Sequence, residues 1–146
     1  FLSAYPTGNY NFANSSNHTF SNISIYNSNY GIYHYTYASG NSNAKSVYHL
    51  FSNISISNVS YGLYFYTYSF GNPITANSSF HSFSNISISG ATSNAVYFYS
   101  QGDWSPGVFI DAFSFSGISI DNSSGGFYFF NQGYTKARFG SFSNIF

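Results

Sequence analysis

A repeated hexapeptide constrains this chain more than any other feature of its sequence. Phe-Ser-Asn-Ile-Ser-Ile occurs at residues 20–25, 51–56 and 83–88, and looser copies follow at residues 115–120 and 142–146. Successive copies begin 31, 32, 32 and 27 residues apart. Self-similarity at a nearly fixed period of this size is typical of repeat architectures, in which each unit packs only against its neighbours.

A second marker recurs with the same period. Gly followed by Asn, Asp or Tyr appears at spacings of 31 or 32 residues. Because Gly and Asn tolerate a positive φ, each repeat is predicted to turn at this marker. Residues 1–19 carry the marker in the same surroundings as later copies, so we predict a single domain, residues 1–146. The coil markers lie at residues 8–9, 40–41, 71–72, 102–103 and 133–134.

An aromatic-rich run precedes each Gly marker, as at residues 32–37, 63–68, 96–99 and 127–130. Aliphatic or Phe residues alternate with Tyr in these runs, and a period of two predicts a β-strand. We predict that the aliphatic and Phe side faces the core and that the Tyr side faces outward with its hydroxyls in water. These outward rows contain Tyr33, Tyr35, Tyr37, Tyr64, Tyr66, Tyr68, Tyr97, Tyr99 and Tyr128.

The hexapeptide itself predicts a second, half-buried strand. In residues 51–56 both Ile side chains share one face and the Ser between them takes the other. Phe51 lies three positions before Ile54 and is out of phase, so a bend at Ser52-Asn53 is predicted to return it to the Ile side. No segment has an apolar period of 3.6 residues with helix caps, so no helix is expected.

Stacking of these units predicts an all-β fold, a right-handed parallel β-helix of about 31-residue coils, with four to five coils. Identical positions would lie about 4.8 Å apart along the axis, with hydrogen-bonded ladders between coils. A β-sandwich or a propeller is the alternative all-β fold, but propeller blades need roughly 40–45 residues.

The stretch Phe-Ser-Asn-Ile-Ser-Ile-x-Asn … Tyr-Gly-Leu-Tyr at residues 51–64 resembles the coil repeat of right-handed parallel β-helix proteins. That group includes pectate lyases, polygalacturonases and phage tailspikes. The resemblance implies the fold and raises a carbohydrate-binding or polysaccharide-cleaving function as an alternative. Enzymes of the group that cleave polyuronates are expected to cluster Asp on one strand face. In this chain Asp103, Asp111 and Asp121 fall at three different positions around one coil. We therefore expect no enzyme and no catalytic residue.

The amino-acid composition argues against several classes of binding partner. Only 4% of the residues are charged, the formal net charge is zero, and Lys45, Lys136 and Arg138 are the only Lys and Arg residues. Nucleic-acid binding, which depends on Lys and Arg, is therefore not expected. The chain has no Cys, so it contains neither a disulfide nor a thiolate metal site. No apolar run approaches the roughly 20 residues of a transmembrane helix.

His18, His49 and His81 each stand two residues before the repeated Phe. Ligands about 4.8 Å apart in a straight row do not converge on one tetrahedral ion, so the row is predicted to pack in a turn and to bind no metal. His34 is replaced by Phe65 in the next coil, which indicates a packing role in the core. No cofactor is expected.

Eight Asn-x-Ser/Thr sequons are candidate N-glycosylation sites. Asn14, Asn58, Asn77 and Asn122 lie in looser segments and rank first. Asn22, Asn53 and Asn85 form a row that is interpreted as a structural Asn ladder, so these three and Asn17 rank lower as acceptors. A coat of glycans would hydrate an aromatic surface that has few charges.

The expected function is structural, in a secreted, N-glycosylated subunit of an extracellular filament or cell-surface coat. The chain begins within a Tyr-rich strand and stops within a hexapeptide strand, and neither end resembles a polar cap. Head-to-tail stacking into a homopolymer is therefore predicted. The Tyr rows would contact a polysaccharide, a peptide or a neighbouring filament. The predicted assembly interface consists of Phe1, Leu2, Tyr5, Phe142, Ile145 and Phe146.

Overall fold

A computed structural model of the chain describes residues 2–4, 9–71, 75–103 and 107–146. Within these ranges the chain forms strands, turns and bends and contains no helix, as predicted. The strands are β1 Leu2–Ala4, β2 Asn9–Ser16, β3 Thr19–Ser39, β4 Asn41–Val47, β5 Leu50–Phe70, β6 Thr75–Ser79, β7 Ser82–Ser89, β8 Asn94–Gly102, β9 Gly107–Asp121, β10 Gly125–Gly133 and β11 Thr135–Ile145.

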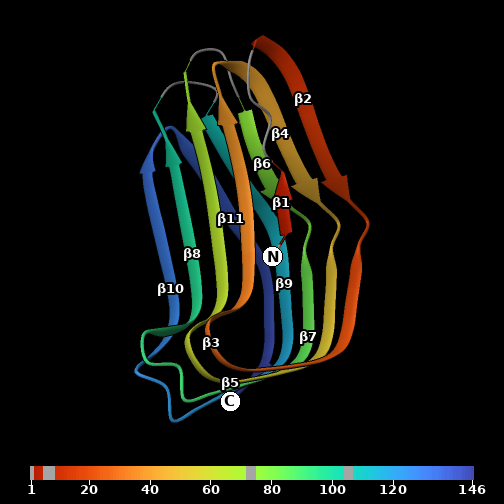
Figure 1. The fold of residues 1–146 in the computed structure, drawn as a ribbon, viewed down its shortest axis with the longest axis vertical. Coiled ribbons are helices and arrows are strands. Elements are labelled where there is room, and N and C mark those ends of the chain that lie inside the picture. The colour runs from red at the N-terminus through yellow and green to blue at the C-terminus, as the bar shows by residue number, and fades with distance from the viewer. Residues whose placement is uncertain (1, 5–8, 72–74, 104–106) are drawn as a thin grey trace.

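Every strand pairing is parallel and joins one coil to the next, which makes the fold a parallel β-solenoid of about 4 turns (Figure 1). Phe51 pairs with Phe20 and Phe83, so the register follows the sequence repeat. In Figure 1 the front strands run upward and the rear strands run downward while the coils advance from right to left. This winding has the predicted right-handed sense.

The coils build three strand arrays, and the long strands β3, β5, β9 and β11 bend through a corner from one array into another. The tyrosine sheet contains β1, residues 32–39 of β3, residues 63–70 of β5, β8 and β10. The return sheet contains β2, β4, β6, residues 107–111 of β9 and residues 135–138 of β11. The hexapeptide sheet contains residues 19–26 of β3, residues 50–57 of β5, β7, residues 114–121 of β9 and residues 141–145 of β11.

The predicted bend in the hexapeptide is a left-handed corner at its Asn. Asn22, Asn53 and Asn85 have φ values of 56°, 53° and 53°. Asn tolerates this conformation better than other residues with a side chain, because its short amide bonds locally. The corner turns Phe51 and Ile54 to the same side, where they are 1% and 2% exposed. This confirms the expectation that a bend restores the phase.

The Gly marker behaves as predicted in the coils of Gly40, Gly71 and Gly133, which all have positive φ. Gly102 likewise ends β8 and Asp103 forms a bend, as predicted, but the expected positive φ is wrong for Gly102. A Cβ at Gly102 would lie 2.4 Å from the carbonyl oxygen of Tyr134. Gly is needed there because two coils approach closely. The marker at residues 8–9 includes Gly8, which lies outside the described residues.

Stacks of apolar side chains fill the space enclosed by the three arrays. In the tyrosine sheet, Leu63, Phe65, Val96 and Phe98 point inward and are at most 1% exposed, so the predicted core face is confirmed. Aromatic rings in the core stack coil on coil, as do Phe51 and Phe83 with ring centroids 4.9 Å apart. Burial of such large side chains is the main source of stability in a fold of this kind.

Candidate functional site

The outward side of the tyrosine sheet forms one aromatic surface, here called the tyrosine face. Its side chains are half-buried, except for Tyr128, which is 44% exposed. The face therefore points outward as the alternation predicted. It consists of Tyr33, Tyr35, Tyr37, Tyr64, Tyr66, Tyr68, Tyr97, Tyr99, Tyr128 and Phe130.

Rings of the tyrosine face stack in columns along the solenoid axis. In the first column the ring centroids of Tyr33 and Tyr64, Tyr64 and Tyr97, and Tyr97 and Tyr128 lie 5.3, 5.0 and 5.1 Å apart. The planes in these pairs differ by only 6°, 8° and 10°. An inner ring such as Tyr97 thus has an aromatic neighbour against each of its two faces.

A second column repeats this arrangement beside the first. Tyr66 lies 5.2 Å from Tyr35 and 4.8 Å from Tyr99, and Tyr99 lies 5.0 Å from Phe130. Burial, and then neighbouring tyrosines, raise the pKa of Tyr64, Tyr66 and Tyr97 above that of a free phenol. These hydroxyls therefore remain protonated at neutral pH and can donate hydrogen bonds.

A polar strip borders the tyrosine face where β8 ends. The Tyr68 hydroxyl donates to Asp103 Oδ2 at 3.1 Å, and Gln101 Nε2 donates to Asp103 Oδ1 at 3.3 Å. The Tyr99 hydroxyl donates to Gln101 Oε1 at 2.5 Å. Burial and the hydrogen bond to Asp103 raise the pKa of Tyr68 to about 12. The sequence around Asp103 predicts only a turn and gives no sign of this contact, because the contact joins residues of different coils.

The predicted histidine row is confirmed as a packed stack. His49 lies 5.1 Å from His18 and 4.9 Å from His81 between ring centroids. His49 Nδ1 accepts from the His18 backbone N–H at 3.2 Å, and His81 Nδ1 accepts from the His49 backbone N–H at 3.2 Å. The His49 and His81 rings thereby bind the backbone of the preceding coil. In the described part of the chain no group of three or more His, Asp or Glu residues is arranged to hold a metal.

His34 adds a buried branch to this stack. Its Nε2 lies 2.7 Å from Ser46 Oγ, which lies 2.9 Å from His49 Nε2. Burial, followed by the neighbouring His49, lowers the pKa of His34 to about 3, and burial with His18 lowers the pKa of His49 to about 4. Burial also lowers the pKa of His81. The buried histidines are therefore neutral at neutral pH, as a core position requires.

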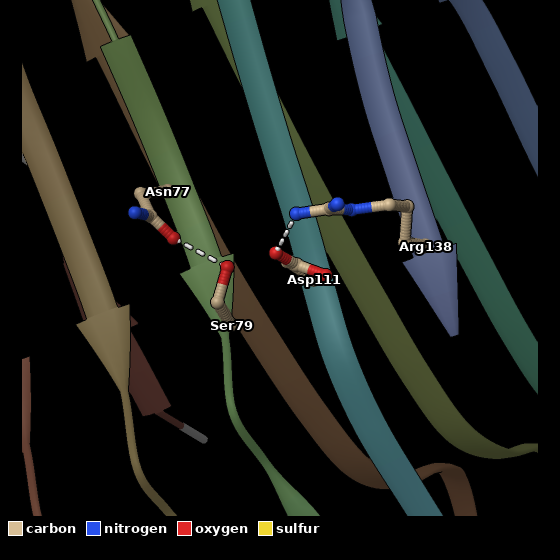
Figure 2. A network of polar contacts seen from close by, with 4 residues as sticks. All are labelled: Asn77, Ser79, Asp111 and Arg138. Atoms are coloured by element: carbon tan, nitrogen blue, oxygen red, sulfur yellow. Dashed lines mark hydrogen bonds and ion pairs between the residues drawn. The ribbon is translucent and has the colours of Figure 1, made fainter. Parts of the chain in front are cut away.

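The three aspartates lie on different sides of the coil, as their positions in the sequence repeat predicted. Asp103 follows β8, Asp111 lies in the return sheet, and Asp121 ends β9 in the hexapeptide sheet. Asp111 Oδ2 accepts from Arg138 at 2.6 Å, beside the hydrogen bond between Asn77 and Ser79 (Figure 2). The Arg138 side chain is 80% exposed, so this ion pair contributes little to stability.

A groove of about 570 Å³ lies on the outward side of the return sheet. Lys136 Nζ lies 5.7 Å from the centre of the Phe109 ring, within the range of a cation–π contact. The groove therefore brings an aromatic ring, two cations and one carboxylate together in a chain that has few charges. Its lining consists of Phe109, Asp111, Thr135, Lys136, Ala137 and Arg138.

The sequons separate into two structural groups. Asn53 Nδ2 donates to Asn22 Oδ1 at 3.4 Å and Asn85 Nδ2 donates to Asn53 Oδ1 at 3.3 Å, which confirms the Asn ladder. Asn14, Asn17, Asn58 and Asn122 are exposed. Asn77 is half-buried and accepts a hydrogen bond from Ser79 at 2.6 Å. Whether any of these residues carries a glycan stays a prediction.

The residues of the predicted assembly interface are partly described. β1 pairs with β3 so that Leu2 stands opposite His34, in the register that the sequence repeat predicts. Phe142, Ile145 and Phe146 are 45%, 37% and 79% exposed. Phe1 and Tyr5 lie outside the described residues.

The fold and these surfaces define the chain as a Tyr-rich parallel β-solenoid. Comparison with protein-family models, with curated proteins and with solved structures gives no match. Among the described residues no helix is long and apolar enough to cross a membrane.

Proposed function

We propose that this chain is a structural subunit of an extracellular filament or surface coat, in which the β-solenoid is a rigid rod with one aromatic side. The stacking within the tyrosine face carries this proposal. Stacking on a sugar or another flat ligand requires an exposed ring face. Inner rings such as Tyr64 and Tyr66 have both faces against rings of neighbouring coils. The columns thus favour a role in stiffening the rod and in lateral packing through ring edges and hydroxyls.

Growth by coil stacking follows from the repeat itself. Phe142 and Ile145 stack on Phe115 and Ile118 as those residues stack on the coil before them. The edge that one coil presents along the solenoid axis is therefore chemically similar to the edge that any other coil presents. Another copy can add in the same register, and such a head-to-tail contact gives an open filament because it does not close into a ring.

Secretion and N-glycosylation belong to the same proposal. The exposed sequons at Asn58 and Asn122 occupy corners with φ values of 51° and 45°. A glycan on either of these exposed side chains would reach solvent. Glycans would also supply hydration to a surface that has few charges.

A carbohydrate-binding domain is the second candidate, and the groove at Phe109 favours it. An aromatic ring beside Lys136, Arg138 and Asp111 offers both an apolar contact and polar partners to a saccharide. A replacement of Phe109 by Ala that abolishes retention on a polysaccharide column, without changing the circular dichroism, would support this candidate.

The main proposal is tested with an edge-blocking variant, Ser143→Lys with Ile145→Pro. Phe146 uses both of its backbone groups toward β9, bonding Ile118 and Ile120 at 2.9 Å each. Backbone groups alternate along a parallel strand, so those of Ile145 point to the open edge, where Pro removes a donor and Lys adds charge. The control is Ser55→Lys with Ser87→Lys, at exposed positions of inner coils.

We expect the parent chain and the control to form filaments by light scattering and electron microscopy, and the edge-blocked variant to remain short or monomeric. A parent chain that is monomeric at high concentration would contradict growth by coil stacking.

A further inference from the structure

The rings of the tyrosine face form a continuous network as well as separate columns. Tyr68 and Tyr66 lie 6.2 Å apart between centroids, Tyr66 and Tyr35 5.2 Å, Tyr35 and Tyr33 6.2 Å, and Tyr33 and Tyr64 5.3 Å. Aromatic rings this close exchange an electron readily once one of them has been oxidised. An electron vacancy created at any ring can therefore move across the whole face.

Where the vacancy settles depends on the proton. A phenol that loses one electron becomes a strong acid, so a hydrogen-bonded base decides which tyrosine holds the radical. The Tyr68 hydroxyl already donates to Asp103 Oδ2 at 3.1 Å, whereas the Tyr99 hydroxyl donates to the weakly basic amide oxygen of Gln101. Gln101 Nε2 also holds the other oxygen of Asp103.

The rest of the chain offers the face no comparable acceptor. The sequence contains three acidic residues, and Asp111 and Asp121 lie in the return sheet and the hexapeptide sheet. His34 and His49 are buried inside the coil, on the opposite side of the strands. Asp103 is thus the carboxylate that reaches the tyrosine face.

We propose that Tyr68 and Asp103 form a proton-coupled oxidation site, to which the tyrosine face delivers electron vacancies made by an external one-electron oxidant. The oxidant class is a peroxidase intermediate or a photogenerated metal complex. In the step, the O–H bond of Tyr68 breaks, its proton passes to Asp103 Oδ2, and one electron leaves through the rings to the oxidant, which is reduced by one electron. The products on the protein are a neutral phenoxyl radical and a neutral carboxylic acid.

The reverse step restores the site. A thiol or ascorbate supplies one electron, and Asp103 returns the proton to the phenoxyl oxygen. Because burial and Asp103 raise the pKa of Tyr68 to about 12, the phenol is intact at neutral pH before oxidation. The proton must therefore leave together with the electron.

The test uses tris(bipyridine)ruthenium, flash-oxidised with persulfate as electron acceptor, and follows the tyrosyl radical by transient absorption and electron paramagnetic resonance. The variants are Tyr68→Phe and Asp103→Asn, which preserve ring stacking and side-chain size. The matched controls are Tyr48→Phe, an exposed tyrosine outside the tyrosine face, and Asp121→Asn. Circular dichroism establishes that each variant is folded before it is oxidised.

We expect the oxidation rate to fall by about tenfold in Asp103→Asn and Tyr68→Phe and to remain unchanged in both controls. Transfer to deuterium oxide should slow oxidation of the parent chain, and this isotope effect should diminish in Asp103→Asn. An unchanged rate in Asp103→Asn, or an equal fall in Asp121→Asn, would overturn the proposal.

Discussion

The side-chain amide of Asn53 donates from Nδ2 to Oδ1 of Asn22 at 3.4 Å, and both residues hold left-handed backbone at the same corner of consecutive coils. One residue type thus serves two tasks, since Asn tolerates the corner and its amide bonds the next coil. Gly117 takes this position in a later coil with a φ of 63°. A Cβ at Gly117 would lie only 2.9 Å from Asn85 Oδ1.

The two tasks can be separated by substitution at Asn53. Asn53→Ala should lower the free energy of unfolding by about 1–2 kcal/mol, because Ala loses the amide and is strained at positive φ. Asn53→Gly should cost less, since Gly accepts the backbone and loses only the exposed hydrogen bonds. Urea denaturation followed by circular dichroism measures both. Equal stability of the Ala and Gly variants would contradict a strained corner.

The interior position of the Ile rows predicts the effect of a buried charge. Ile54→Asp should abolish folding, because an unpaired carboxylate would lie among stacked Ile side chains at a position that is 2% exposed. Ser55→Asp, at the neighbouring exposed position, is the matched control and should change the melting temperature little. An unchanged melting curve for Ile54→Asp would show that the row is not buried.

Close coil contacts at Gly62 predict a different defect. A Cβ there would lie 2.5 Å from the carbonyl oxygen of Ala95 and 2.8 Å from Ile88, so Gly62→Ala should destabilise the chain by about 1–3 kcal/mol. A Cβ at Gly126 would meet nothing within 4 Å, so Gly126→Ala should be neutral or slightly stabilising. Thermal melting compares the two variants, and a Gly62→Ala variant as stable as the parent would refute the close packing.

The buried histidines predict a loss of stability in acid. The pKa values of His34 and His49 are lowered to about 3 and about 4, against roughly 6.5 in an unfolded chain. Below pH about 6.5 the unfolded chain therefore takes up protons that the folded chain excludes. Stability is complete above that pH and should fall, toward pH 4 and then 3, by up to about 1.4 kcal/mol per pH unit for each histidine.

The matched variant for this acid effect is His81→Phe, because Phe113 stands one coil further along the same row. Removal of one buried histidine should make the decrease in stability shallower between pH 6.5 and 4.5, above the usual range of Asp. Urea titrations at several pH values measure the slope. The same slope in the variant and the parent would exclude His81 from the effect.

The exposed sequons predict covalent mass on the natural protein. The intact mass of the natural protein, measured by mass spectrometry, should be larger than the 16.2 kDa of the polypeptide. After expression in a host that glycosylates, replacement of Asn14, Asn58 and Asn122 together by Gln should remove most of the added mass. Asn53→Gln should remove none, because Asn53 belongs to the ladder. A natural protein with the mass of the bare polypeptide would end this prediction.

Much of the fold could be predicted because the repeat makes each position report on several coils at once. The register of Phe51 with Phe20 and Phe83, and the bend at Asn53, follow directly from spacing and phase. The backbone conformation of Gly102 could not be predicted from the marker, because the local sequence does not say whether a Gly serves a positive φ or a close approach. There the backbone of Tyr134 in another coil decides.

The sequence by itself determined the coil period, the parallel stacking and which side of each strand faces the core, since these depend on periodicity and hydrophobic burial alone. Only the tertiary structure decided that the tyrosine ring faces pack against rings of neighbouring coils. It also decided that Tyr68 hydrogen-bonds to Asp103 and that Ser46 links His34 to the histidine stack. Those contacts depend on side-chain directions and on distances between coils. Such quantities are set by how the whole coil closes, and no local pattern of residues encodes them.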